Sequence, residues 1–468
     1  MALDAEPFKP PHPLSAPPRA APVVRGLPLV GALPEFMKDP PGTVLRAARA
    51  HPGELFGLRL GPVTAYVVSQ PEHVQQVVHN PRSFSKGGRM WDGARLLVGN
   101  GLATSGGALW LRQRRLMQPL FLPAHIASLV DTIVDVLERE VERFVAHAGT
   151  GEVLDMDVEA MHLTQQVLLA AMFGASISAS YAAQLGRDIQ AAMRSLSLRM
   201  FLHFIPRRLP LPGDRRFNDA VARIDAVMMR LVAERRRSGL ERADLVSSLL
   251  RAHVEGVEQG MDDAQIRDEL VTMFIAGNEA LAMTLTWAWY ELDQHPEVAR
   301  KLRAEINAVL GDRRPTYADL ERLVYTRYTL METMRRYPSA WAFPRFTEGP
   351  ELVGGYQLPA RATLLVSPLA THCDPAIWDR PELFDPDRFS PERSAGRSRY
   401  AYYPFGDGPR QCIANNLAMA AAQLTLAMMA PRVRPRLAPG QRVALGTAIS
   451  LKPRYGMKMR VDAVERSV

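Results

Sequence analysis

Hydrophobic residues recur with a helical period through most of the middle of the chain. The pattern runs from Trp110 to about Ala308, and it is interrupted near 149–151, 206–212 and 256–260, where glycine and proline gather. The bulk of the protein is therefore predicted to be α-helical.

Shorter apolar stretches on either side of this part are typical of strands. Leu55–Leu60 and Ala65–Ser69, joined by a Gly-Pro turn, predict a hairpin, and Pro71–Val78 predicts a helix after it. Further strands are expected at Leu352–Leu358 and Ala362–Val366. The fold class is thus predicted to be mainly α with a smaller β-rich lobe (α+β).

The segment Asp262–Asp293 contains no proline and a single glycine, Gly277, so we expect it to form one long helix. At 1.5 Å per residue it would span roughly 48 Å, enough to cross a whole domain. Its middle is apolar on nearly every face, and then Asn278 and Glu279 follow in one turn. A polar pair inside a buried helix is costly, so we expect these residues to have a function.

The first 28 residues are rich in proline and alanine, which predicts an extended segment. Residues 29–468 are expected to form a single domain, made of the β-rich lobe and the large helical lobe. The N-terminal segment has no apolar h-region, and it has no uninterrupted apolar span near 20 residues. We therefore expect no signal peptide, no membrane anchor and a cytoplasmic location.

Composition narrows the possible partners. Hydrophobic residues make up 47% and charged residues 23% of the chain, which is typical of a globular protein. The net charge of +8 comes from arginines spread through the predicted helices rather than from a basic run, so we expect no nucleic-acid partner. A net positive charge would also favour the binding of an acidic redox partner.

Only two cysteines occur, Cys373 and Cys412, which excludes a disulfide framework and fits a reducing compartment. Cys412 follows a turn rich in glycine and precedes a predicted helix, Asn415–Ala430. Free amides at a helix start favour a thiolate, and those near Ile413 and Ala414 could bind a metal-bound sulfur. A buried free cysteine is the alternative.

The segment that ends at this cysteine resembles the signature of the cytochrome P450 family, F-x-x-G-x-R-x-C-x-[GA]. Phe405, Gly408, Arg410, Cys412 and Ala414 occupy its positions. The resemblance implies the cytochrome P450 fold, with the long helix over a haem b (iron protoporphyrin IX). It also implies that Cys412 is the axial ligand of the iron, with Phe405, Gly406 and Ile413 beside the cofactor.

Two further elements support the resemblance. Glu332 and Arg335 match the family's E-x-x-R, and Arg388 lies in a segment like its P-x-R-F, which implies a buried triad of paired charges. The spacing from Glu332 to Arg335 places both side chains on one helix face, and a second arginine can bind the same carboxylate.

Four residues are expected to hold the two haem propionates by the same comparison. Trp110 and Arg114 share one face of a predicted helix, Arg345 lies ten positions after Arg335, and Arg410 lies two positions before the cysteine. Two buried carboxylates require cations beside them. Judged singly, each arginine is equally compatible with a solvated surface position.

The long helix departs from the family pattern [AG]-G-x-[DE]-T-[ST]. Glu279 matches the acid, but Ala280 stands in the position of the threonine. The catalytic candidates are therefore Asn278, Glu279 and Ala280, with one proton-directing hydroxyl absent. A substrate hydroxyl or a water could replace it, peroxide could replace O2, or the reaction could be something other than hydroxylation.

The resemblance implies a monooxygenase that inserts oxygen from O2 into an apolar, medium-to-large molecule such as a terpenoid or polyketide. Electrons would come from a separate ferredoxin or flavodoxin with its reductase. Substrate contacts are expected from a loop at Ser85–Gly99 and from Leu196–Leu209. The alternatives are a haem-thiolate peroxygenase, isomerase or dehydratase, and, in another class, a haem-binding or sensor protein without turnover.

Overall fold

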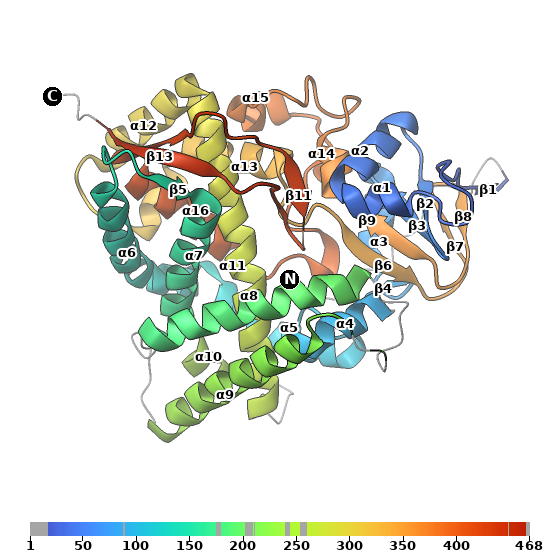
Figure 1. Cartoon of the computed structure of the whole chain (residues 1–468), viewed down its shortest axis with the longest axis horizontal. Coiled ribbons are helices and arrows are strands. Elements are labelled where there is room, and N and C mark those ends of the chain that lie inside the picture. The colour runs from blue at the N-terminus through green and yellow to red at the C-terminus, as the bar shows by residue number, and fades with distance from the viewer. Residues whose placement is uncertain are drawn as a thin grey trace. The chain divides into compact units, whose positions relative to one another are not determined.

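The computed structural model describes residues 17–464, apart from 88, 175–178, 202–208, 210, 239–243, 253–259 and 448 (Figure 1). The chain forms two compact units. The first contains Met1–Gly88, Tyr328–Ile413 and Arg442–Gly456, and the second contains Arg89–Arg327, Ala414–Gln441 and Met457–Val468. The expectation of an extended segment 1–28 before a single domain 29–468 stays a prediction.

The first unit is built on a five-stranded sheet with the strand order β2-β3-β9-β6-β4. Its strands are β2 (Phe56–Leu60), β3 (Val63–Val68), β4 (Phe84–Ser85), β6 (Phe343–Thr347) and β9 (Thr363–Val366). All pairs are antiparallel except β3 with β9, which is parallel. The predicted hairpin at 55–69 and the strand at 362–366 are thus confirmed.

Smaller sheets and short helices complete this unit. The remaining strands are β1 (Arg19–Ala20), β7 (Glu351–Val353), β8 (Tyr356–Leu358), β11 (Leu445–Thr447) and β12 (Leu451–Pro453). The helices are α1 (Leu33–Lys38), α2 (Pro40–Ala50), α3 (Pro71–His79), α14 (Pro368–His372) and α15 (Pro391–Ser394), with α13 (Val324–Arg336) crossing the boundary. Buried aliphatic residues of β3, β9 and α3 form its core.

The single strand predicted at Leu352–Leu358 is wrong, because the chain turns in its middle. Gly354 and Gly355 have φ angles of 54° and 83°, and the two halves pair as the antiparallel strands β7 and β8. A Cβ at Gly354 would lie 1.8 Å from the His73 ring. Glycine is therefore required there both for its backbone conformation and for space.

The second unit is helical. Its helices are α4 (Arg89–Val98), α5 (Gly107–Met117), α6 (Pro123–Ala146), α7 (Met156–Phe173), α8 (Ala179–Phe201), α9 (Asp214–Ser238), α10 (Leu245–Arg251), α11 (Asp263–Gln294), α12 (Pro296–Leu310) and α16 (Asn415–Met429). One antiparallel sheet joins β10 (Val433–Leu437), β13 (Lys458–Ala463) and β5 (Val153–Asp155).

The expected loop at Ser85–Gly99 is also wrong, because most of it is the helix α4. Ala94, Leu97 and Val98 fall on one helix face and are buried, and this burial stabilises the helix. Of the expected substrate segment Leu196–Leu209, residues 196–201 belong to α8 and 202–208 lie outside the described residues.

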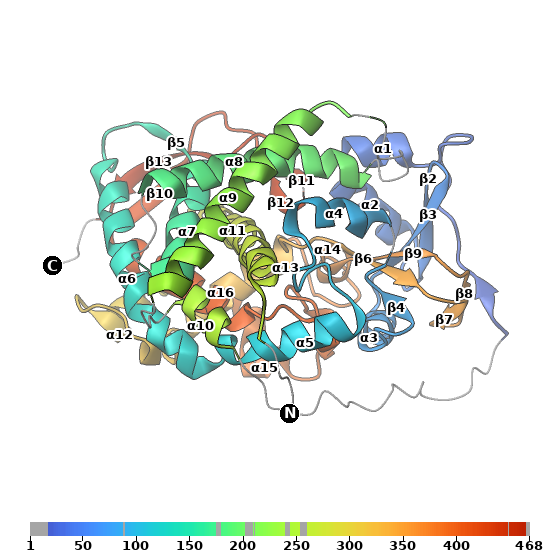
Figure 2. The ribbon, with the colours of Figure 1, turned by 90° about the horizontal axis from the view of Figure 1, so that it is seen from below.

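The long helix α11 confirms the prediction for Asp262–Asp293 to within one residue at each end. Asp262 caps it, accepting a hydrogen bond from the backbone N–H of Gln265 at 2.7 Å. It packs against α7, α9, α12 and α16, and in Figure 2 it is seen nearly along its axis. By length and hydropathy α11 could span a membrane, but 67% of its most apolar stretch is buried, as in the core helix of a globular unit.

Candidate functional site

The loop before Cys412 is shaped by hydrogen bonds within itself. The backbone N–H of Cys412 donates to the carbonyl of Phe405 at 2.9 Å, and that of Gln411 donates to the carbonyl of Gly408 at 3.0 Å. Gly406 and Gly408 have φ angles of 68° and 71°. Cys412 is exposed and lies three residues before α16 begins.

The same loop approaches α3 so closely that only glycine fits. A Cβ on Gly408 would lie 2.4 Å from the carbonyl oxygen of Val78. The glycine of the signature therefore allows the cysteine loop to lie against α3. This is a physical reason for the motif that its spacing alone does not reveal.

Asp407 fastens the loop, and the sequence did not single it out. Its carboxylate, 5% exposed, accepts two hydrogen bonds from Arg399 at 2.9 Å and lies 3.6 Å from Nε2 of His79. Burial alone would raise the pKa of Asp407, but hydrogen bonds from His79, the Gly408 N–H and Arg399 lower it overall. In the sequence, the position of this carboxylate between Gly406 and Gly408 could have indicated its role in the loop.

Arg345 and Arg410 supply positive charge in the first unit. Arg345 is 6% exposed, it donates to the carbonyl of Pro344 at 2.9 Å, and no ion pair to it is found among the described residues. Burial, and then the charge of Arg410, lower the pKa of Arg345 to about 10, and burial lowers that of Arg410 to about 10. Two neighbouring cations, one buried and one half-buried, fit an anionic group such as a haem propionate.

The expected triad is assembled in the interior. Glu332 and Arg335 are fully buried, with hydrogen bonds of 2.7 and 2.8 Å between them, and Arg388 reaches Glu332 at 3.3 Å. The remaining donors of the two arginines bind backbone carbonyls, among them those of His372 and Arg380. Satisfying these donors is what makes so many buried charges tolerable.

An aromatic cluster of Trp378, Phe389 and Tyr402 covers the triad. Arg397 stacks on Trp378 with its guanidinium carbon 4.2 Å from the ring centroid. His372 stacks on Tyr402, and burial, followed by the charge of Arg335, lowers the pKa of His372 to about 3. His372 is therefore neutral, and its Nε2 can accept from the Tyr403 backbone N–H at 3.1 Å.

The catalytic candidates lie on α11 in the second unit. Asn278 is 5% exposed, and its Oδ1 accepts a hydrogen bond from Thr164 of α7 at 2.6 Å. The amide thus fastens α11 to α7, a structural task that the sequence did not indicate. Glu279 and Ala280 are half-buried.

No hydroxyl on the next turn replaces the missing threonine. Thr284 donates its hydroxyl to the carbonyl of Ala280 at 3.0 Å, as helical threonines commonly do. Gly277 lies close to α7, where an added Cβ would be 3.2 Å from the Leu168 side chain. The other two propionate candidates are on α5, where Trp110 is buried and Arg114 is half-buried on the same face.

Sequence reasoning also missed Glu269, the most unusual acid of the second unit. It is fully buried, one oxygen accepts from the Leu102 N–H at 2.9 Å, and the other has no hydrogen-bond partner among the described residues. Burial raises its pKa to about 8, and the nearby Asp268 adds to the rise. No local sequence pattern indicates that Glu269 is buried, because the segment that covers it, the loop between α4 and α5, is distant in the sequence.

Three successive residues of α11 hold this loop and the last turn of α4 before it. Arg267 donates to the carbonyl of Leu97 at 3.0 Å, and Asp268 accepts from the Asn100 N–H at 2.7 Å. Glu269 binds Leu102 as the third contact. Residues 267–269 thus fix the loop and the end of α4 to α11 through hydrogen bonds.

These observations define a class of protein with an exposed cysteine on a shaped loop, buried cations suited to an anionic cofactor, and a long helix carrying an acid. Comparison with known proteins gives the family. A family model described as Cytochrome P450 matches residues 21–445. The chain belongs to the cytochrome P450 family.

Bacterial relatives match almost end to end. Cyclooctatin synthase of Streptomyces melanosporofaciens is 38% identical over 91% of this chain and 92% of that protein. Cyclooctat-9-en-7-ol 5-monooxygenase of the same organism is 36% identical over 85% of each. Pentalenene oxygenase of Streptomyces avermitilis is 32% identical over 88% of this chain and 90% of that protein.

The fold agrees with a solved structure described as the cytochrome P450DA heme domain. The TM-score is 0.88 at 23% identity, over 96% of this chain and 98% of that chain. The predicted P450 fold is confirmed. The protein is a P450 monooxygenase with a haem b cofactor, and it acts on a small molecule with electrons from a partner.

Replacing Glu332 with glutamine should destabilise the first unit severely. The change leaves Arg335 and Arg388 buried without a counter-charge, which costs about 3–5 kcal/mol. Chemical denaturation measures the loss. Glu382, which is exposed, provides the control, and Glu382→Gln should change the free energy of unfolding by less than about 0.5 kcal/mol. Equal effects of the two variants would contradict the assignment.

Replacing Glu269 with glutamine should change how stability depends on pH. The unfolded chain loses this proton near the ordinary carboxyl pKa, whereas the folded chain keeps it up to about pH 8. The native state therefore binds more protons between pH 5 and 8, and Glu269 makes stability fall with rising pH by up to about 1.4 kcal/mol per unit.

Denaturation of wild type and Glu269→Gln at pH 5 and pH 8 measures this effect. The stability of the variant relative to wild type should increase with pH. A difference that is the same at both pH values would show that Glu269 titrates normally in the folded protein.

Proposed function

We propose that this chain oxygenates a terpenoid, inserting one oxygen atom from O2 into an apolar, medium-to-large substrate. The observation that supports this proposal is that relatives above 30% identity, matched over most of their length, are named for the oxygenation of pentalenene and cyclooctat-9-en-7-ol. Both names describe apolar ring compounds with few polar groups. A substrate of this kind is oriented chiefly by shape and apolar contact.

The residues of this chain have distinct roles in the proposal. Cys412 would bind the haem iron through its thiolate, and Phe405, Gly406 and Ile413 would contact the haem. Arg345, Arg410, Trp110 and Arg114 would hold its propionates. When bound, the haem supplies oxygen activation and oxygen transfer, with the thiolate donating electron density. The triad of Glu332, Arg335 and Arg388 holds the scaffold of the cysteine loop.

Proton handling is assigned to Glu279. Ala280 has no proton to give, and the hydroxyl of Thr284 is committed to the helix backbone. The proton that a threonine would direct must therefore come from water or from a hydroxyl of the substrate. An alcohol substrate, such as the one named for the second relative, carries such a hydroxyl.

The electron donor in this proposal is a ferredoxin or flavodoxin with its own reductase, and the location is cytoplasmic. The net charge of +8 supports an acidic partner, since complementary charge raises the rate of encounter.

Cys412→Ala should abolish the strongly red-shifted Soret band of the reduced CO complex, because that band requires a thiolate ligand. Cys373→Ala is the matched control and should retain the band. The Cys373 thiol has a pKa raised by burial, so it is a poor candidate for a ligand thiolate. A wild-type protein without the band would remove the basis of the proposal.

Ala280 also favours a second candidate, a haem-thiolate enzyme that uses peroxide, or one that acts as an isomerase or dehydratase. Pentalenene and cyclooctat-9-en-7-ol serve as probe substrates, supplied either with NADH, ferredoxin and reductase or with hydrogen peroxide. Oxygenated product with the redox chain supports the monooxygenase. Product with peroxide alone supports the second candidate, and any oxidised product excludes a sensor without turnover.

A further inference from the structure

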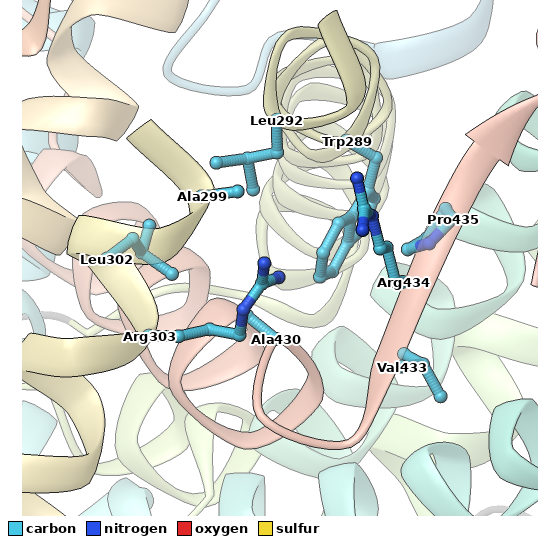
Figure 3. Close-up of a pocket in the computed structure, with 9 residues that line it drawn as sticks. All are labelled: Trp289, Leu292, Ala299, Leu302, Arg303, Ala430, Val433, Arg434 and Pro435. Atoms are coloured by element: carbon cyan, nitrogen blue, oxygen red, sulfur yellow. The ribbon is translucent and has the colours of Figure 1, made fainter. Parts of the chain in front are cut away.

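A pocket in the second unit lies between the C-terminal half of α11, α12, the end of α16 and β10 (Figure 3). Its walls are mainly apolar and include Trp289, Leu302 and Val433. Two arginines interrupt them, and Figure 3 shows Arg303 entering from α12 and Arg434 from β10. None of these residues has a role in the proposed oxygenation.

The two arginines have no counter-charge. Both are half-buried, and within the described part of the chain neither forms a hydrogen bond or an ion pair. Burial, and then the charge of Arg434, lower the pKa of Arg303. Two cations that repel each other beside apolar walls are unfavourable unless an anion joins them.

The acids on the surrounding elements are engaged elsewhere. On α11, Glu291 pairs with His295 at 3.2 Å and Asp293 accepts from the Leu437 N–H at 3.0 Å. On α12, Glu297 pairs with His295 at 3.3 Å, and Glu305 accepts from the Thr326 N–H at 2.8 Å.

The acid on the strand next to Arg434 is also engaged elsewhere. Asp462 of β13 stands opposite Arg434 in the register of the strands. Its carboxylate binds Arg436 instead, at 2.8 Å. Among the residues that the structure describes, Arg434 thus has no ion-pair partner, although an acid lies on the neighbouring strand.

We propose that this pocket is a binding site for a small oxyanion, a phosphate or carboxylate group held between Arg303 and Arg434. Guanidinium groups bind such anions through paired hydrogen bonds, and apolar walls strengthen the attraction. The cavity, about 10 Å³, is close to the space of one water molecule. The cavity therefore has room for about one oxygen atom of a phosphate or carboxylate, and the rest of the anion would lie outside it.

Calorimetric titration of the haem-loaded protein tests the site, with sodium phosphate or sodium acetate added against chloride of equal ionic strength. Wild type should bind phosphate or acetate saturably. Arg303→Met with Arg434→Met should weaken that binding at least about tenfold. Arg436→Met, on the same strand but paired with Asp462, is the matched control and should bind as wild type does.

Thermal unfolding provides a second measurement. Phosphate or acetate should raise the melting temperature of wild type and of Arg436→Met but not that of the double variant. In chloride alone, Arg303→Met should not lower the melting temperature, because it relieves the repulsion. An unchanged CO spectrum verifies that each variant is folded.

Binding of phosphate alone assigns the site to phosphate groups, and binding of acetate assigns it to carboxylates. Absence of saturable binding by both ions, or equal binding by the double variant, would overturn the proposal. Neither result affects the proposed oxygenation, which the CO spectrum and product formation test separately.

Discussion

The paired charges of Glu332 hold the part of the molecule on which the cysteine loop depends. The carboxylate fixes Arg335 and Arg388, and Arg335 in turn binds the carbonyl of His372. Further hydrogen bonds connect His372 to the loop. His372 accepts from the Tyr403 N–H, and the carbonyl of Tyr403 accepts from the Gly406 N–H at 2.9 Å. The buried ion-pair network is therefore linked by hydrogen bonds to the loop that carries Cys412, and Asp407 also holds that loop.

Charged groups with little solvent exposure are accommodated in three ways. In the triad the single carboxylate, Glu332, pairs with two cations, whereas Arg345 and Arg410 are two neighbouring cations whose charges repel. Arg303 and Arg434 form another pair of neighbouring cations, in the second unit. Glu269 represents the third way: burial raises its pKa to about 8, so the neutral form prevails at physiological pH.

The long helix explains both what the protein can do and what it lacks. Gly277 permits close contact with α7, and Asn278 fixes that contact through Thr164. Glu279 and Ala280 come next, both half-buried, and Ala280 offers no hydroxyl. The contact between the helices thus falls on Gly277 and Asn278, and the proton delivery that we propose falls on Glu279.

The sequence by itself determined the features that depend on local spacing. The cysteine signature, the glycine turns, the hairpin at 55–69 and the helix at 262–293 depend on φ angles, capping and periodicity, which neighbouring residues specify. The tertiary structure alone decided which charges are buried and which partners they have. Asp407, Glu269 and Asn278 acquire their roles from contacts with distant segments, and so does the Arg303–Arg434 pair. The helix α4 likewise formed where a loop was expected, because burial of its apolar face outweighed a weak local pattern.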